Sequence, residues 1–443
     1  MARRTISSLL LIGCCALCAG CAPSQDADVK EAVATGSGGQ DAGPENTGTQ
    51  ESVPREPVEP SVEYFALDAP EGMSRAVAVE GFPLVYTRQL LPLDAEGNLV
   101  GEGAAEKQIE QVLANLETVL TAAGSGLGKL VRLNVCIDSP TTTDLLREQL
   151  GKRLDASVRP AISSVVSPLS HPKALIGVDA VAIAEANGDS VALQRCESVA
   201  GDQACADVSI LPRGGMVYLS GQTDKSALAE ATVKSLTTLL EIVDQLELER
   251  SQVAQLKVFL QPATATGEVL REVKKLFAGQ RVPPVVFVEW IASAPVEIEM
   301  VVHLPLSENK PAETLRFYTP PGVKASPTFS RVAIVDTERQ IFISGLSART
   351  AGDGEAQVRD VFAQLKQILS ATGSDFRHLA KATYYVSDEG EDEGASKKLN
   401  ELRPEFYDPK RPPAASKAAV QGVGRSDRTL SIDMIAVGSG ESS

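Results

Sequence analysis

The stretch Val217-Tyr218-Leu219-Ser220 has two counterparts of the same residue pattern elsewhere in this chain. This repetition is the best guide to the architecture of the chain. Each copy is an apolar strand that ends in a small hydroxyl residue, and the other copies are Leu84-Val85-Tyr86-Thr87 and Ile341-Phe342-Ile343-Ser344. An amphipathic helix follows each strand, because apolar residues recur at the spacing of one helical face. In the first copy these residues are Ile109, Val112, Leu113, Leu116 and Leu120.

A second strand, a second helix, a Pro-containing turn and a closing strand complete each copy. The second strands lie at residues 133–137, 256–260 and 383–386, and the second helices near residues 143–155, 266–278 and 395–407. Acidic and apolar residues alternate in the closing strands, whose acids are Asp179, Glu299 and Asp433. Helices that follow strands in this order cover one face of a mixed sheet. We therefore predict an α+β chain of three tandem domains, at residues 62–185, 207–304 and 317–439.

The N-terminal residues have the features of an export signal. Arg3 and Arg4 precede a short apolar stretch, and Ala19-Gly20-Cys21 resembles a lipoprotein cleavage site. Residues 1–20 are thus predicted to be a signal peptide with Cys21 as the lipidated residue; lipidation at Cys14 and an uncleaved anchor are the alternatives. Residues 21–61, rich in Gly, Ser, Pro and Glu, predict a disordered tether. We expect an exported protein that faces the periplasm or the cell exterior and is attached to a membrane only through lipid.

Composition restricts the kinds of partner that this chain can have. The 443 residues have a formal net charge of −16, whereas binding to a nucleic acid needs a basic face. We therefore expect no nucleic-acid partner. His171, His303 and His378 have no metal-ligand spacing, and no glycine-rich phosphate loop is present, so neither a metal nor a cofactor is expected.

Three cysteines lie outside the N-terminal segment. Cys196 and Cys205 flank a short polar loop and predict a disulfide in an oxidising compartment, with two free thiols as the alternative. Cys136 lies in an apolar strand and is expected to pack as a small hydrophobic residue.

The order of strands and helices, the same in each copy, together with several short motifs of single copies, resembles the RidA family, also called YjgF. The most specific are Ser220-Gly221-Gln222 and Val296-Glu297-Ile298-Glu299, and the third copy adds Asp408-Pro409-Lys410-Arg411-Pro412-Pro413-Ala414. The resemblance implies chorismate-mutase-like domains that assemble in threes, with ligand sites in the clefts between them. It also implies a small carboxylate-bearing ligand, since the family's deaminases hydrolyse enamines and imines to keto acids and ammonia.

The resemblance assigns roles to individual strand residues. In the family a Glu of the closing strand activates water, which implies catalytic roles for Glu299, Asp179 and Asp433. The alternative is that these acids are solvated residues of an alternating strand. A hydroxyl after the first strand implies ligand-binding roles for Thr87, Ser220 and Ser344. The alternative is that these hydroxyls serve the turn at the strand end.

The family's carboxylate anchor, an Arg just after a Pro-Ala pair, is missing from every copy. Its positions hold Ile162, Val285 and Ala415. The family's cleft Tyr is replaced by Met73 in the first copy and Phe329 in the third. Because the paired hydrogen bonds between a guanidinium and a carboxylate are strong, their loss argues against the family's activity. Three other arginines lie a few residues before these positions, namely Arg159, Arg281 and Arg411. We predict that they either enter the clefts or lie on the surface.

Two functions are therefore open. The first is a protein that binds small metabolites in clefts between its repeats and has a degenerate deaminase site. The second is an active enamine or imine deaminase. Because one chain contains three copies, we expect it to close an intramolecular pseudo-trimer and to be a monomer. Pairing of the copies between separate chains is the alternative.

Overall fold

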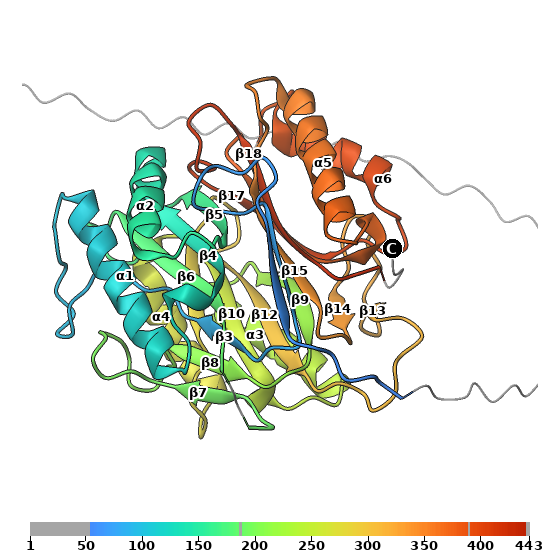
Figure 1. Ribbon diagram of the computed structural model, residues 1–443, viewed down its shortest axis with the longest axis horizontal. Helices are drawn as coiled ribbons and strands as arrows, with labels where there is room; N and C mark the ends of the chain where they lie inside the picture. The colour runs from blue at the N-terminus through green and yellow to red at the C-terminus, as the bar shows by residue number, and fades with distance from the viewer. Residues whose placement is uncertain (1–53, 186–187, 389, 440–443) are drawn as a thin grey trace, which may run out of the picture. The chain divides into compact units, whose positions relative to one another are not determined.

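The computed structural model describes residues 54–185, 188–388 and 390–439, which belong to one compact unit. The predicted signal peptide, Cys14, Cys21 and most of the predicted tether lie outside the described residues. Three mixed six-stranded sheets form the unit, and helices cover the outer face of each (Figure 1). The predicted α+β class with tandem domains is confirmed, whereas the domain boundaries stay predictions.

The first sheet combines the strands of the first predicted domain with a hairpin from the chain that follows it. Its order is β5 (Ala161–Val166), β4 (Leu130–Ile137), β6 (Ile176–Ile183), β3 (Leu84–Thr87), β8 (Val208–Leu211) and β7 (Ala192–Gln194). β4 and β5 are parallel, and the other neighbours are antiparallel. Parallel strands need a crossover connection, which here contains α2 (Pro140–Arg153).

The other two sheets repeat this order. The second is β11 (Val285–Glu289), β10 (Val253–Leu260), β12 (Val296–Leu304), β9 (Gly215–Asp224), β14 (Val332–Val335) and β13 (Leu315–Tyr318). The third is β17 (Ala414–Ala419), β16 (Leu379–Val386), β18 (Leu430–Ala436), β15 (Gln340–Leu346), β2 (Ala76–Glu80) and β1 (Ser61–Phe65). Each again has one parallel pair, β10 with β11 and β16 with β17.

Two helices accompany each sheet. In chain order they are α1 (Ala105–Ala122) and α2, α3 (Leu228–Gln245) and α4 (Thr266–Leu276), and α5 (Gly354–Ala371) and α6 (Ala395–Phe406). Short 3-10 turns lie at Leu127–Lys129, Arg250–Gln252, Ala263–Ala265 and Phe376–His378. The apolar residues predicted to form the buried face of α1 are all buried, so the periodicity identified this helix and its orientation. Within the described residues, no helix is both long and apolar enough to cross a bilayer.

At three short turns the chain passes from one sheet to another, so that consecutive strands pair with different partners. β2 and β3 are separated only by Gly81-Phe82-Pro83, yet β2 pairs with β15 and β3 pairs with β8. The same step occurs between β8 and β9 and between β14 and β15. The N-terminal hairpin β1–β2 therefore completes the C-terminal sheet, beside which it runs in Figure 1. The third sheet is thus built from two separate stretches of chain, which the repeat pattern did not predict, whereas β3–β8 and β9–β14 each form a sheet from one continuous stretch.

The inner faces of the three sheets share one apolar core. It includes residues from every sheet, among them Val77, Tyr86, Val131, Tyr218, Ala333, Phe342 and Ile435. The Tyr218 hydroxyl crosses from the second sheet to the third and donates to Gln340 Oε1 at 2.6 Å. Because a buried hydroxyl is costly without a partner, this bond helps to define how the sheets meet. The sheets therefore cover one another within a single chain.

Candidate functional site

The acids predicted to be catalytic lie inside the molecule, where the sheets meet. Asp179, Glu299 and Asp433 are 4%, 3% and 2% exposed. Asp433 forms an ion pair with Arg132 of the first sheet at 2.5 Å, and Glu299 forms one with Lys381 of the third sheet. Glu299 and Asp433 are therefore each paired with a base of a neighbouring sheet.

Asp179 has a different surrounding from Asp433. Burial raises the pKa of Asp179 to about 6, although the nearby Lys257 and a 2.7 Å hydrogen bond from Asn134 oppose the rise. Burial alone would also raise the pKa of Asp433, but Arg132 and Lys257 outweigh it and hold that pKa below its ordinary value. Asp179 borders an internal void of about 10 Å³, which has room for no more than a single water molecule. The catalytic role of these acids stays a prediction.

The hydroxyls predicted to bind ligand are fully buried, and only Thr87 lies at the end of its strand, because β9 and β15 continue beyond Ser220 and Ser344. Thr87 Oγ1 accepts a hydrogen bond from Ala180 N at 2.9 Å. For Ser220 and Ser344, no partner of the Oγ atom is found in the described part of the chain. Their ligand-binding role also stays a prediction.

The strand register corrects one of these assignments. Ser220 N and Ser344 N donate to Arg331 O and Arg75 O, and in the first sheet the matching bond runs from Arg88 N to Asp207 O at 2.8 Å. Arg88, not Thr87, therefore occupies the position of Ser220 and Ser344. The sequence contained evidence for this alignment, because Val85-Tyr86 matches Val217-Tyr218. That match aligns Thr87 with Leu219 and therefore Arg88 with Ser220.

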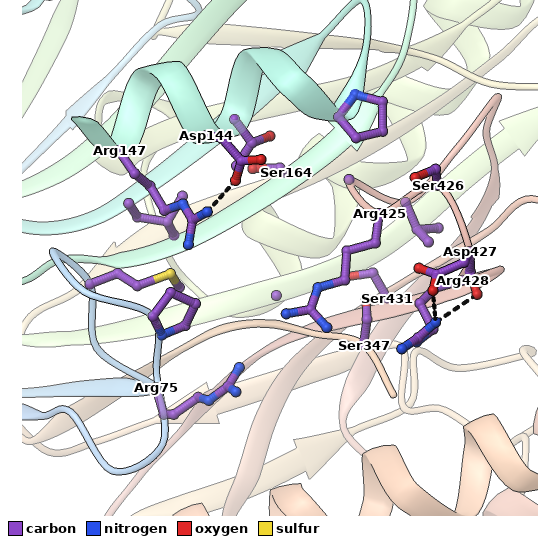
Figure 2. Close-up of a pocket in the computed structure, with 18 residues that line it drawn as sticks. Arg75, Asp144, Arg147, Ser164, Ser347, Arg425, Ser426, Asp427, Arg428 and Ser431 are labelled. Carbon is purple, nitrogen blue, oxygen red and sulfur yellow. Dashed lines mark hydrogen bonds and ion pairs between the residues drawn. The ribbon is translucent and has the colours of Figure 1, made fainter. Parts of the chain in front are cut away.

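A cavity of about 370 Å³ lies between the first and third sheets, and we name it the basic cleft (Figure 2). Ile162 and Met73, the residues at the family's Arg and Tyr positions, both line it. Four arginines from other positions also line it, namely Arg75, Arg147, Arg425 and Arg428. The cleft implied by the resemblance is therefore present, with a different set of cations.

Local structure explains how these arginines reach the cleft. α2 begins with Pro140, which is favoured in the first helical turn, and brings Arg147 to the rim. The loop between β17 and β18 is held against β5 by a hydrogen bond from Val166 N to Gly422 O at 2.9 Å. Gly424 in this loop has a φ of +76°, and an added Cβ would lie 2.8 Å from Ser164 O. Only glycine suits that turn, which delivers Arg425 to the cavity.

The four arginines differ in how far they are already engaged. Arg428 is committed to the protein, because it donates to Ala348 O and Arg349 O at 2.6 and 2.9 Å and pairs with Asp427 at 2.7 Å. Arg75 pairs with Asp68 at 2.9 Å, and Arg147 pairs with Asp144. Arg425 is exposed, and its side chain has no hydrogen bond or ion pair among the described residues.

Sequence reasoning missed Arg425 because it considered only the position after the Pro-Ala pair and the arginines a few residues before it. The available signal was the polar loop Gly424-Arg425-Ser426-Asp427-Arg428. The substitutes that it named lie elsewhere: Arg159 donates to Ala156 O at 2.9 Å, Arg281 is exposed, and Arg411 pairs with Glu313 at 3.1 Å. None of the three lines the basic cleft.

A second cavity, of about 330 Å³, lies between the first and second sheets, and we name it the apolar cleft. Val285 holds the family's Arg position there, and other apolar lining residues are Leu91, Leu93, Val199, Leu270 and Phe287. Its arginine, Arg88, is paired with Asp207 at 2.5 Å and also donates to Ala200 O. Charge in this cleft is therefore already neutralised.

The boundary between the second and third sheets contains a carboxyl group of its own. Glu297 packs directly on Gly221, where an added Cβ would lie 2.0 Å from Glu297 Oε1. Gly221 N donates to Ser416 Oγ at 3.1 Å. Burial raises the pKa of Glu297 to about 7, an effect that Ser416 opposes and Glu299 increases. Ala415, at the family's Arg position, is buried.

The three cysteines that the structure describes form no bridge with one another. Cys136, Cys196 and Cys205 are free, and Cys196 Sγ lies 3.1 Å from Ser198 Oγ. The predicted Cys196–Cys205 disulfide is thus not formed; Asp207 fixes this segment instead, since it accepts from Cys196 N at 2.7 Å and pairs with Arg195 at 2.6 Å. Cys136 is buried, as predicted. The described residues also contain no group of three potential metal-ligating side chains.

Comparison with known proteins agrees with this architecture. The model of the family described as Endoribonuclease L-PSP matches residues 66–184 and 322–438. A RutC family protein of Synechocystis is 32% identical over 117 residues, which cover 26% of this chain and 88% of that protein. Protein DfrA of Myxococcus xanthus is 31% identical over 121 residues, with the same coverage.

Solved structures of single domains resemble parts of the chain. A YjgF family member from Neisseria meningitidis has 23% identity and a TM-score of 0.22, and covers 29% of this chain and 97% of its own. A Rid family protein of unknown function from Yersinia pestis has 28% identity and a TM-score of 0.24, and covers 28% and 98%. Each of these proteins thus matches about one repeat of this chain.

Proposed function

Because this chain belongs to the family described as Endoribonuclease L-PSP, to which the RidA and YjgF proteins belong, we propose that it binds a small carboxylate-bearing metabolite in the basic cleft without deaminating it. The observation that supports this most is the unpaired guanidinium of Arg425 at the cleft. A planar guanidinium matches a carboxylate through two parallel hydrogen bonds. Arg425 thus supplies, from a neighbouring repeat, the anchor that Ile162 lacks.

The position of the acids favours binding over hydrolysis. A general base must lie within hydrogen-bond reach of the water that it activates. The basic cleft is lined by Ser431, whereas Asp433, two residues further along β18, is paired with Arg132. The acids that do line the cleft, Asp144 and Asp427, are each paired with an arginine of their own segment.

The second candidate function is a deaminase, and one observation favours it. Glu297 lies on the closing strand beside Ser416 and has a pKa of about 7, which suits a group that exchanges protons near neutrality. Its boundary between β9 and β17 would then be the catalytic cleft. Replacement of Glu299 or Glu297 by Gln would abolish such an activity.

Calorimetric titration of the purified full chain with 2-oxobutyrate tests the proposed function. We expect saturable binding that Arg425→Ala weakens by about tenfold or more, since one charge-assisted hydrogen bond contributes about 1.5–3 kcal/mol. A parallel assay with enzymatically generated imines should show no release of ammonia above the uncatalysed rate. Turnover that depends on Glu297 would establish the deaminase instead, and unchanged binding in Arg425→Ala would refute the assigned anchor.

We also propose that the protein is an exported lipoprotein attached through Cys21. The apolar stretch at residues 6–19 and the small residues before Cys21 support this. Cys21→Ser is expected to block maturation and to release the protein from membranes. Cys14→Ser is the matched control, and a membrane-bound Cys21→Ser protein of unchanged mass would contradict the assignment.

We propose further that the chain is a monomer in solution. The shared apolar core supports this, because residues of all three sheets of one chain already contribute to it. Light scattering on the delipidated protein should give the mass of one chain. A stable particle of three chains would show that repeats pair between molecules.

A further inference from the structure

The basic cleft has guanidinium groups on opposite walls. Arg147 reaches it from α2 of the first repeat, and Arg425 reaches it from the loop between β17 and β18 (Figure 2). Arg75, from the N-terminal hairpin, also points into the cavity (Figure 2). Cations on two walls are arranged to hold two separated anionic groups better than one.

Charge in the lining is compatible with the same expectation. Three of the four arginines are paired with an aspartate, since Asp68 from outside the lining pairs with Arg75, and one positive charge, that of Arg425, is left over. One carboxylate of a ligand neutralises this charge. A second carboxylate can take the place of Asp144 at Arg147, because Asp144 is largely exposed and an exposed ion pair contributes little free energy.

Hydrogen-bonding capacity is left at Arg425, which is unpaired, as described above. On the opposite wall, Arg147 pairs with Asp144 through Nη2, and its Nε, which has no partner among the described residues, is buried. A ligand carboxylate on that wall would therefore accept from the outer nitrogens of the Arg147 guanidinium, as the carboxylate of Asp144 does.

The space between the walls suits a short carbon chain. Pro70, Met73 and Ile162 supply apolar surface, and Ser164 and Ser347 supply hydroxyls. A volume of about 370 Å³ is in the range of a small-molecule site.

We infer that the ligand of the basic cleft is a short dicarboxylate, with one carboxylate at Arg425 and the other at Arg147. This inference rests on the proposed function and narrows it from carboxylates in general to dicarboxylates. The apolar cleft is not a site for such a ligand, because its arginine is paired with the buried Asp207, whereas the partner of Arg147 is exposed.

Glutarate and valerate test the inference, because they have the same chain length and differ by one carboxylate. Titration of the full chain should show glutarate binding about tenfold or more tightly than valerate. Both Arg147→Ala and Arg425→Ala should abolish this preference, since each leaves a single anchor. Arg425 is exposed, so its replacement should not impair folding.

Two controls separate the outcomes. Arg359→Ala, an exposed arginine of α5 that pairs with Glu355 outside the cleft, should leave both affinities unchanged. Inorganic phosphate places its charge at one point, so it should bind more weakly than glutarate.

Equal affinities for glutarate and valerate would overturn the dicarboxylate assignment and leave the proposed function standing. Phosphate binding as tight as that of glutarate would show that charge rather than the spacing of the walls is recognised, and would also overturn it. Binding of none of these anions would refute the proposed function itself.

Discussion

The basic and apolar clefts are built from corresponding elements and differ in their chemistry. In each, the strand at the sheet edge has an apolar residue at the family's Arg position, Ile162 in β5 and Val285 in β11. The difference comes from the loop before the closing strand of the neighbouring sheet. That loop supplies Arg425 to the basic cleft and Ser170 to the apolar cleft. Loops can change in this way because the sheets beneath them determine the fold.

Buried cations lie between the sheets at both clefts, but their partners differ. Arg132 and Asp433 form an ion pair that joins the two sheets of the basic cleft. At the apolar cleft, Lys257 opposes the rise that burial causes in the pKa of Asp179, whereas its Nζ donates to the hydroxyl of Tyr385 in the third sheet at 2.5 Å. The two clefts thus differ in the contacts between their sheets as well as in their ligand chemistry.

The largest expected effect concerns the ion pair at the basic cleft. Arg132→Leu leaves Asp433 buried without its partner and should lower the free energy of unfolding by about 3–5 kcal/mol, as measured by urea denaturation. The double variant Arg132→Leu/Asp433→Leu should recover most of the loss, because neither charge is then buried alone. A double variant as unstable as the single one would show that packing, not charge, is responsible.

A smaller effect is expected at the loop that distinguishes the clefts. Gly424→Ala places a Cβ 2.8 Å from Ser164 O at a positive φ, and should cost about 1–3 kcal/mol and weaken anion binding. Gly373→Ala is the matched control, because it has a similar φ of +70° with open space around it. Equal losses of stability, with anion binding intact in both, would mean that the contact with Ser164 does not position Arg425.

The pH dependence of stability tests the boundary between the second and third sheets, which contains Glu297. In strand register, Glu297 occupies the position that Ser431 occupies in the basic cleft. The pKa of Glu297 is raised to about 7, so its stabilising contribution is present below its ordinary pKa and is lost as the pH rises through about 7. Glu297→Gln should remove this loss of stability, about 3 kcal/mol between pH 4 and pH 8, as measured by urea denaturation across that range. Glu355→Gln, a change of a half-exposed side chain in the first turn of α5, should leave the dependence unchanged. A profile unaltered by Glu297→Gln would contradict the raised pKa.

The smallest effect is expected beside the apolar cleft, which Cys205 lines. Because Cys196 and Cys205 are free, Cys196→Ser should change the free energy of unfolding by less than about 0.5 kcal/mol, with or without a reductant. A disulfide across this short loop would instead make the loss about 2–3 kcal/mol under oxidising conditions only.

Much of the fold followed from local patterns. The spacing of Ile109, Val112, Leu113 and Leu116 identified α1 because a helix with one apolar stripe must turn that stripe toward a sheet. The order of strands and helices, repeated along the chain, identified three units of one architecture. The position of the basic cleft also followed, since Ile162 and Met73 do line it.

The sequence could not reveal which residues act together across the sheets. Periodicity tells whether a side chain faces the core or the solvent, but it does not identify the partner of that side chain. The exchange of β2 into the third sheet, the pairing of Asp433 with Arg132 and the entry of Arg425 into the basic cleft all join residues that are far apart along the chain. Such contacts exist only after the sheets have packed, because burial and the neighbouring charges then determine which groups are paired and which are free to bind a ligand.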